Sequence, residues 1–302
     1  MRNKHLIKLA ILIAGLSTVL LTGCNDAKLS RSKAQHVITA TVSDIVKERV
    51  PKDKDKLNER KIREFKDMVL SSLLNGDGDG RKSLPISGFD SFFHSGASGI
   101  SDFNNRTPRD KASFGLEDYT YEALAQLGYI TVQPSGPLTV KYDQSPSSTH
   151  FDKSRVVNFT PRAEVGTDST KMTSDNVFYC YAKNTNGSQC NLPAFTVEHP
   201  AQFKITGIVQ DDATHAKVRV LIPWELTPFA KELKPIAARV DKQRLSVLGT
   251  DYYKDFITDS WPATLSRSAD SGAYPATVLF QRYDDGWRIV DSNGQSVKDQ
   301  AL

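Results

Sequence analysis

Hydrophobic residues recur at helical spacing in the first half of the chain. Segments 34–50 and 57–74 carry them three and four positions apart, which predicts two amphipathic helices. A third such pattern covers 114–127, and Gly128 is suited to end that helix. The inward-facing positions expected for the first two helices are Ile38, Val42, Ile45, Val46, Val50, Ile62, Phe65, Met68, Val69, Leu73 and Leu74.

Alternating apolar and polar residues dominate the second half. They predict two strand pairs, with Asp284-Asp285-Gly286 as the turn of the second pair. Between the pairs we expect a helix over 226–248, interrupted at Pro228 and Pro235. The paired strands are 203–210 with 216–222 and 277–283 with 287–290, and further short strands are expected at 129–132, 138–142, 155–160 and 177–181.

The helix at 114–127 and the two strands after it favour a small winged-helix-like element. Residues 134–137 would turn the first of these strands back onto the second. Many α+β modules share this shape, so it does not imply DNA binding. The predicted fold class is α+β: N-terminal helices, a small winged-helix-like element, then an antiparallel sheet covered by helices.

A polar segment at 166–176 is the predicted domain boundary. It would separate a helical and winged-helix-like domain at 34–165 from an antiparallel α+β domain at 177–295. Residues 76–105 are rich in glycine and serine but keep several aromatic side chains, so we expect a long loop packed on the folded body.

The first 23 residues have the three parts of an export signal. Positive charges are followed by an apolar stretch at 9–21, which is short for a transmembrane span. The sequence Leu21-Thr22-Gly23-Cys24 resembles the bacterial lipobox, in which signal peptidase II cuts before the cysteine and the thiol receives diacylglycerol. An ordinary cleaved signal and an uncleaved anchor helix are the alternatives. The resemblance implies a lipoprotein with acyl chains such as palmitate at Cys24, followed by a tether at 24–33.

Lipid attachment would determine where the protein resides. Three acyl chains, at about 0.8 kcal/mol per buried methylene, make attachment to the membrane effectively permanent. In enteric bacteria an aspartate directly after the cysteine favours the inner membrane, and this chain has Asn25 there. We therefore expect the outer membrane, with the protein facing the periplasm.

Removal of the signal changes the charge and leaves two cysteines to explain. Three of the 39 Lys and Arg lie in the signal, which leaves 39 − 3 = 36 against 35 Asp and Glu. A net charge near +1 gives no reason to expect a nucleic-acid partner. With Cys24 acylated, Cys180 and Cys190 form an even pair in an oxidising compartment, so we expect a disulfide across a hairpin. A metal site, the alternative, lacks a second Cys-x-x-Cys or a neighbouring histidine pair.

Residue patterns that indicate catalysis or metal binding are sparse. Asn75, Asp77 and Asp79 place oxygen atoms at alternate positions, as a calcium loop does, but Ile86 stands where an EF-hand needs a carboxylate. The stretch around His94 lacks the glycine spacing of a nucleophile elbow. We favour a glycine- and aspartate-rich helix stop at 75–80, with a looser calcium turn as the alternative. We predict no catalytic residue and no cofactor, and we favour a non-enzyme over a hydrolase. The residues on which a hydrolase would depend are Ser95, Ser98 and Ser101, and the other histidines, His36, His150, His199 and His215, are scattered.

Aromatic residues gather in the C-terminal half. Most are expected in the core, but any that share an exposed face would form a surface for a partner or ligand. They are Tyr179, Tyr181, Trp224, Tyr252, Tyr253, Trp261 and Trp287.

Three stretches are similar to a set of uncharacterised proteobacterial envelope proteins. They are 121–130 (YEALAQLGYI), 157–162 (VNFTPR) and 178–183 (FYCYAK), followed by the 204–205 strand and Trp224. In that family a winged-helix-like half joins a sheet half through a Cys-Tyr-Gly-Lys stretch, whereas this chain has Ala182 in place of the glycine and inserts the Cys190 loop. The resemblance covers roughly 114–231, implies a two-part architecture and brings no activity.

These features predict a membrane-anchored, periplasm-facing lipoprotein that binds another protein of the cell envelope. A small-molecule or glycan-binding module is the first alternative. A pocket lined by Trp224, Trp261 or Trp287 would favour that alternative, and a packed sheet would count against it. A hydrolase that uses the Ser/His-rich stretch is the second alternative.

Overall fold

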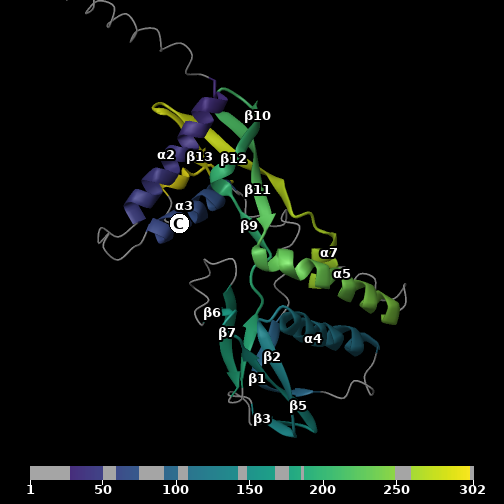
Figure 1. The fold of residues 1–302 in the computed structure, drawn as a ribbon. Coiled ribbons are helices and arrows are strands. Elements are labelled where there is room, and N and C mark those ends of the chain that lie inside the picture. The colour runs from purple at the N-terminus through teal and green to yellow at the C-terminus, as the bar shows by residue number, and fades with distance from the viewer. Residues whose placement is uncertain are drawn as a thin grey trace, which may run out of the picture. The chain divides into compact units, whose positions relative to one another are not determined.

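The chain forms two compact units, each built from separate stretches of sequence (Figure 1). The structure, a computed structural model, describes residues 28–49, 59–74, 92–100, 108–141, 148–166, 177–184, 187–248 and 260–299. Unit 1 contains Met1–Ser83, His199–Pro223 and Ala273–Leu302, and unit 2 contains Leu84–Glu198 and Trp224–Gly272. This division does not coincide with the predicted boundary at 166–176, because strands on both sides of that segment pair within unit 2.

Two helices of unit 1 follow the predicted apolar patterns. Helix α2 (Arg31–Arg49) buries Ala34, Ile38, Val42 and Ile45, and helix α3 (Glu59–Leu74) packs beside it. Helix α2 starts three residues earlier than predicted, inside the expected tether, because Ser30 acts as an N-cap. The Ser30 hydroxyl oxygen accepts a hydrogen bond from the Lys33 backbone N–H at 3.2 Å. In α3, Met68 lies outside the buried stripe, with 59% of its surface exposed.

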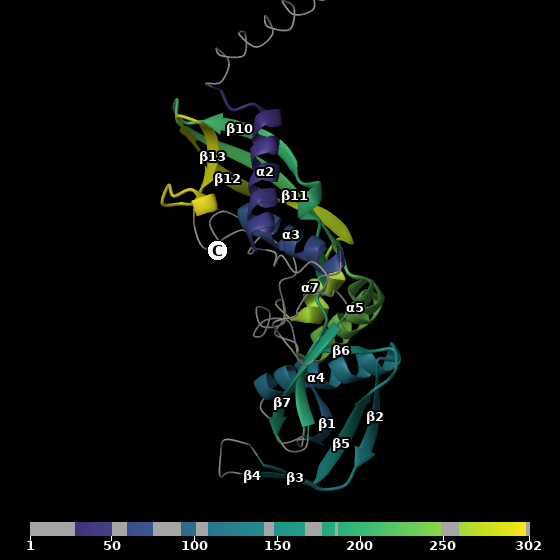
Figure 2. The ribbon, with the colours of Figure 1, turned by 90° about the vertical axis from the view of Figure 1, so that its left-hand side faces the viewer.

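The sheet of unit 1 has the order β10-β11-β12-β13, and β9 also pairs with β11 at its unit 2 end. Both predicted strand pairs are confirmed, including the hairpin turn at 284–285. Helix α2 contacts both edge strands, β10 and β13, so it crosses one face of this sheet (Figure 2). The strands are β9 (Thr196–Glu198), β10 (Lys204–Gln210), β11 (His215–Leu226), β12 (Ser271–Tyr283) and β13 (Gly286–Val290), and short 3-10 helices lie at η5 (Pro200–Gln202) and η6 (Val297–Asp299).

Unit 2 contains a larger sheet with the order β2-β5-β1-β8-β7-β6. Its pairs are antiparallel except β6 with β7, and a separate hairpin joins β3 to β4. The strands are β1 (Phe92–Ile100), β2 (Ile130–Ser135), β3 (Leu138–Lys141), β4 (Ser148–Phe151), β5 (Lys153–Phe159), β6 (Glu164–Gly166), β7 (Val177–Asn184) and β8 (Gly187–Asn191). The helices are α4 (Pro108–Gln126), α5 (Pro228–Leu248) and α7 (Trp261–Arg267).

Aromatic rings form the centre of the unit 2 core. The ring of Phe178, on β7, has no exposed surface. Its centroid lies 5.4–5.9 Å from those of four other rings, mostly in edge-on or tilted geometry. These four belong to Phe93, Tyr129, Phe159 and Phe229.

The α+β class is confirmed, but the wing of the winged-helix-like element is wrong. Strand β2 pairs with β5 and strand β3 pairs with β4, so the two strands after α4 do not pair with each other. Gly128 does end α4 as predicted, with φ of 75° and hydrogen bonds that return to the last helical turn.

The loop predicted over 76–105 is wrong where the structure describes it. Residues 92–100 form β1, which lies between β5 and β8 in the sheet. Glycine permits this close packing: a Cβ at Gly99 would lie 2.1 Å from the Phe151 ring, and one at Gly187 would lie 2.2 Å from the Ser95 carbonyl oxygen.

Helix α5 also differs from its prediction, because it continues through Pro235 without interruption. Pro228 occupies its first turn, where a missing N–H costs little. Around Pro235, the buried residues Leu233, Ile236 and Ala237 hold the helix against the core, which offsets the loss of one backbone hydrogen bond.

Candidate functional site

A surface hollow of about 420 Å³ in unit 1 is the main candidate site. One wall is a face of α2, and the other is the β12–β13 hairpin with the segment that follows it. The lining residues are His36, Val37, Ala40, Thr41, Asp44, Asp285, Gly286, Trp287, Arg288, Ile289, Ser296 and Lys298.

A salt bridge connects the two walls of the hollow. Lys298 Nζ lies 2.6 Å from Asp44 Oδ2. This hydrogen bond lowers the pKa of Asp44 and raises the pKa of Lys298 from their ordinary values. A turn brings Lys298 there: the Asp291 carboxylate accepts the backbone N–H groups of Asn293 and Gln295, which folds the chain back after β13.

A second salt bridge lies in the hairpin itself. Arg288 Nη2 is 2.5 Å from Asp285 Oδ2, and the hydrogen bond from Arg288 lowers the pKa of Asp285. The Arg288 guanidinium also lies 4.8 Å from the centroid of the Tyr283 ring, a cation–π distance. The charged lining side chains are thus paired with each other.

Trp287 belongs to the lining but is almost wholly buried, with 4% of its surface exposed. Its indole N–H is buried and has no hydrogen-bond partner in the structure. Such a donor costs about 1–3 kcal/mol when it stays unpaired. This makes Trp287 the least satisfied polar side chain of the hollow.

The other aromatic residues proposed for a shared surface are dispersed. In unit 2, Trp261 donates its indole N–H to Thr120 Oγ1 at 3.1 Å, and Trp224 packs against Gly272. Tyr179 is buried, while Tyr181 is 49% exposed. Tyr252 and Tyr253 lie outside the described residues.

A hydrogen-bonded group lies between β1 and α4 in unit 2. Tyr121 donates its hydroxyl hydrogen to Glu117 Oε1 at 2.9 Å and accepts the backbone N–H of His94 at 2.9 Å. His94 Nδ1 lies 3.4 Å from the same carboxylate oxygen. Arg155 lies over the Tyr121 ring and binds Asp118 at 2.7 Å. The Tyr121 hydroxyl oxygen therefore provides the backbone N–H of His94, on β1, with a hydrogen-bond acceptor.

This environment shifts two pKa values. Burial raises the pKa of Tyr121 above its ordinary value, and the Glu117 charge adds to the shift. Burial would also raise the pKa of Glu117, but the hydrogen bonds from His94 and Tyr121 outweigh it and lower that pKa. Glu117 is therefore ionised at neutral pH and stabilises the folded unit.

We expect unit 2 to lose stability as the pH falls below about 4.3, the usual pKa of a glutamate side chain in an unfolded chain. The pKa of Glu117 is lower in the folded protein than in the unfolded chain. Ionised Glu117 therefore stabilises the fold fully at a pH above its unfolded-state pKa, and this stabilisation is lost as the pH falls through its folded-state pKa. Urea unfolding between pH 7 and pH 3 measures this. Glu117→Gln should flatten the profile in the acid range, whereas Glu122→Gln, on the exposed side of the same helix, should keep the wild-type slope.

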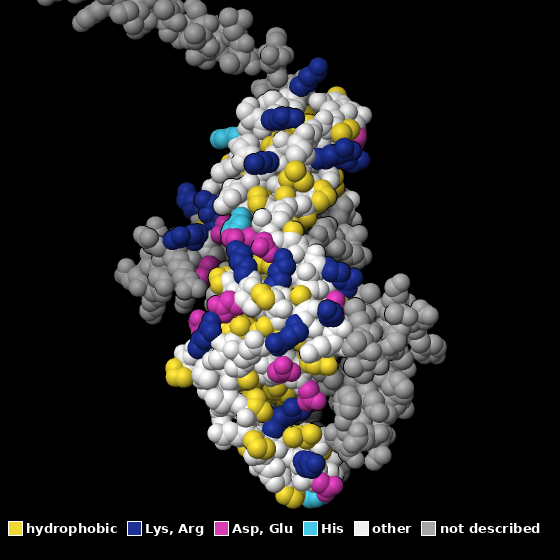
Figure 3. Space-filling view, turned by 45° about the vertical axis from the view of Figure 1, so that its right-hand side comes forward, with side chains coloured by type: hydrophobic (Ala, Val, Ile, Leu, Met, Phe, Trp, Pro, Cys, Tyr) yellow, Lys and Arg dark blue, Asp and Glu magenta, His cyan; other side chains and the backbone are white. Residues whose placement is uncertain are grey.

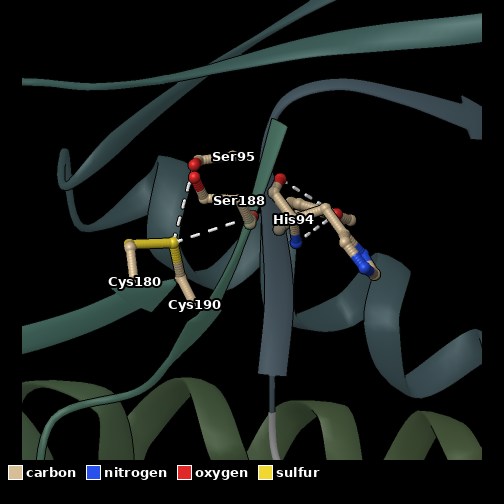
Figure 4. Close-up of a disulfide and its surroundings, with 6 residues drawn as sticks. His94, Ser95, Cys180, Ser188 and Cys190 are labelled. Atoms are coloured by element: carbon tan, nitrogen blue, oxygen red, sulfur yellow. Dashed lines mark hydrogen bonds between the residues drawn. A yellow bond between two sulfur atoms is a disulfide. The ribbon is translucent and has the colours of Figure 1, made fainter. Parts of the chain in front are cut away.

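The predicted disulfide is confirmed. Cys180 on β7 and Cys190 on β8 lie opposite each other in the strand register, and an S–S bond joins them. Cys190 Sγ is 3.5 Å from Ser95 Oγ and 3.9 Å from the Ser188 carbonyl oxygen, as Figure 4 shows. Closing a loop of this length contributes about 2–3 kcal/mol in the chain-entropy model.

Within the described residues, the histidine and serines of β1 are not placed together as a serine hydrolase would require. His94 is directed to Glu117, whereas Ser95 lies beside the disulfide. Ser98 is opposite Arg155, four residues along the strand from His94. Ser101 lies outside the described residues.

Other predicted sites cannot be placed. Cys24 and the calcium-loop candidates Asn75, Asp77 and Asp79 lie outside the described residues. Within the described ranges, no group of three or more His, Cys, Asp or Glu side chains is arranged to hold a metal ion.

Sequence reasoning missed the hollow, because its walls come from opposite ends of the chain. His36 and Asp44 are ordinary polar residues of an amphipathic helix, and Lys298 follows the last strand. A local pattern gave no signal that they meet.

Comparisons with protein-family models, with curated proteins and with solved structures found no match to this chain. The envelope family that it resembles thus stays a prediction. None of the helices that the structure describes has the length and apolar character needed to span a membrane.

Proposed function

We propose that this protein is a lipoprotein of the bacterial cell envelope, anchored through Cys24, whose folded units face the periplasm and bind another envelope protein. The observation that carries the proposal is the sequence Leu21-Thr22-Gly23-Cys24 at the end of an apolar stretch. Helix α2 begins at Arg31, so the folded body starts seven positions after the acylated cysteine. Asn25 supports the outer membrane as the location.

Binding through a folded surface fits the charge distribution and the hollow. On the face that Figure 3 shows, basic and acidic side chains are both present among the described residues, and hydrophobic side chains form small groups. A surface of mixed charge is not suited to nucleic acid. The hollow offers a concave, half-polar patch instead, a usual setting for recognition.

A small-molecule or glycan-binding module remains the second candidate, since the hollow is lined by Trp287. The burial of that ring weighs against glycans. Sugars stack on exposed aromatic faces, and Trp287 exposes only 4% of its surface. We therefore rank a protein partner first.

We expect a partner to cross-link to the protein in intact envelopes and to depend on the hollow. Thr41→Arg places a long cation among the lining residues, so it should reduce recovery of the partner at least tenfold. Thr39→Arg makes the same change at an exposed position of α2 outside the lining and should leave recovery unchanged. The measurement is affinity purification after cross-linking, with quantitative mass spectrometry. Absence of any stoichiometric partner with the wild-type protein would refute the proposed function.

A further inference from the structure

We infer that unit 1 docks on the surface of the anchoring membrane through one face of its sheet and binds anionic phospholipid there. The inference rests on the proposed function, since it takes the acyl chains at Cys24 as given, and it adds an orientation for the folded body. Three observations carry it: the positive charge of the face, the exposed aliphatic side chains among the cations, and the short chain that leads from Cys24 to the sheet.

The docking face is the side of β10 and β11 opposite α2. Alternate residues of β11, among them Val218 and Val220, are fully buried on the α2 side of the sheet. The residues between them, and their partners on β10, are exposed or half-buried on the other side. Figure 3 is turned toward that side and shows Lys and Arg side chains beside hydrophobic ones in its upper part. We call this surface the basic face, and its residues are Lys204, Gly207, Val209, Lys217, Arg219 and Leu221.

The basic face carries positive charge that the protein itself does not neutralise. Residues 204–210 and 215–223 contain no Asp or Glu. Lys204 and Arg219 have no ion-pair partner among the described residues, whereas Lys217 binds an aspartate in the turn between the two strands at 3.0 Å. Anionic headgroups attract exposed Lys and Arg side chains of this kind.

Aliphatic side chains among the cations favour a bilayer over a free anion. Val209, opposite Lys217, exposes 42% of its surface, and Leu221, opposite Lys204, is half-buried. A soluble phosphate would leave these side chains in water. A membrane surface offers phosphate groups to the cations and the boundary of the acyl region to the aliphatic side chains.

The anchor brings the basic face close to lipid. Arg31 lies seven positions after Cys24, so a fully extended chain spans at most about 25 Å between them. The Arg31 guanidinium donates to the Thr206 carbonyl oxygen on β10 at 3.1 Å, which places a further cation at the edge of the basic face. Acylation of Cys24 therefore keeps β10 within reach of the headgroups. Helix α2, one wall of the hollow, lies on the other side of the sheet and stays accessible to a protein partner.

The test is co-sedimentation with vesicles of the mature chain 24–302 with Cys24→Ala, which has both folded units and no acyl chain. Vesicles with equal parts of phosphatidylglycerol and phosphatidylcholine should bind it about tenfold or more better than vesicles of phosphatidylcholine alone. Each Lys or Arg near an anionic bilayer strengthens binding about fivefold, so Lys204→Glu with Arg219→Glu should weaken it about tenfold or more. Lys47→Glu with Lys66→Glu makes the same change in net charge at exposed positions of α2 and α3 and should leave binding unchanged. Circular dichroism establishes that each variant is folded.

A second measurement locates the contact in the acylated protein. Val209→Trp places an indole on the basic face, and phospholipid brominated near the headgroup should quench its emission. Thr39→Trp, at an exposed position of α2, should not be quenched, and the native tryptophans are buried in both variants.

Three results would each overturn the inference: equal binding to the two kinds of vesicle, equal losses for the two charge-reversed pairs, or equal quenching of Val209→Trp and Thr39→Trp. The sedimentation needs neither the acyl chain nor an envelope partner, so its failure is separate from failure of the proposed function.

Discussion

Replacing Cys24 by alanine is expected to move the protein from the membrane fraction to the soluble periplasm. In the proposed processing diacylglycerol attaches to the Cys24 thiol and a third acyl chain to the Cys24 amine that cleavage exposes, and these three chains account for nearly all of the membrane affinity. Fractionation followed by immunoblotting measures the distribution, and labelling with radioactive palmitate measures acylation. We expect the label to disappear completely and membrane association to fall at least tenfold.

The chain provides a matched control for this experiment. Cys180→Ala together with Cys190→Ala also removes cysteines but leaves Cys24 in place, so the protein should stay acylated and sediment with membranes. Continued membrane sedimentation of Cys24→Ala after a carbonate wash would show that another segment anchors the protein.

Phe178→Ala is expected to have the largest effect on stability. Truncation removes a fully buried ring and leaves a cavity among four aromatic neighbours, and changes of this kind cost about 3–5 kcal/mol. Losses of this size approach half of the total stability of an ordinary domain. Unit 2 should therefore unfold at a much lower urea concentration.

Fluorescence in a Trp287→Phe background follows unit 2 alone, since Trp224 and Trp261 both belong to it. Tyr181→Ala is the matched control, because Tyr181 lies on the same strand with 49% of its surface exposed. We expect it to change the free energy of unfolding by less than about 1 kcal/mol. Equal losses for both variants would mean that the aromatic centre is not the main source of stability.

Regular periodicity made some elements predictable from sequence. Helix α2, helix α3 and the hairpin of β12 with β13 carry strong local patterns, and their side chains bury as those patterns require. The disulfide was predictable because the acylation expected at Cys24 leaves only one pair of cysteines.

Strand β1 could not be predicted, because its sequence gives no strand signal. Residues 92–100 include glycines and serines that disfavour strands, and only pairing with β5 and β8 makes the segment extended. The prediction that the two strands after α4 pair with each other was wrong for a similar reason. A turn sequence at 134–137 suggested a local hairpin, but tertiary pairing joins β2 to β5 instead.

The hollow was beyond sequence reasoning for a different reason. Its walls are separated by more than two hundred residues along the chain, and the β12–β13 hairpin and the turn after it bring Lys298 to Asp44. Contacts of that sequence separation leave no local pattern.

The discontinuous make-up of unit 1 has a consequence for the proposed export. Its sheet needs residues from Ala273 to Val290, whereas unit 2 is complete in sequence at Gly272. In the proposed export the chain would cross the inner membrane from its N-terminus, so α2 would reach the periplasm before β13, the last strand that it contacts. Unit 2 can assemble during that interval. A chain that stops before Ala273 thus keeps every residue of unit 2 and the pair β10–β11, but it lacks β13 and most of β12, so α2 keeps only one of its two edge strands.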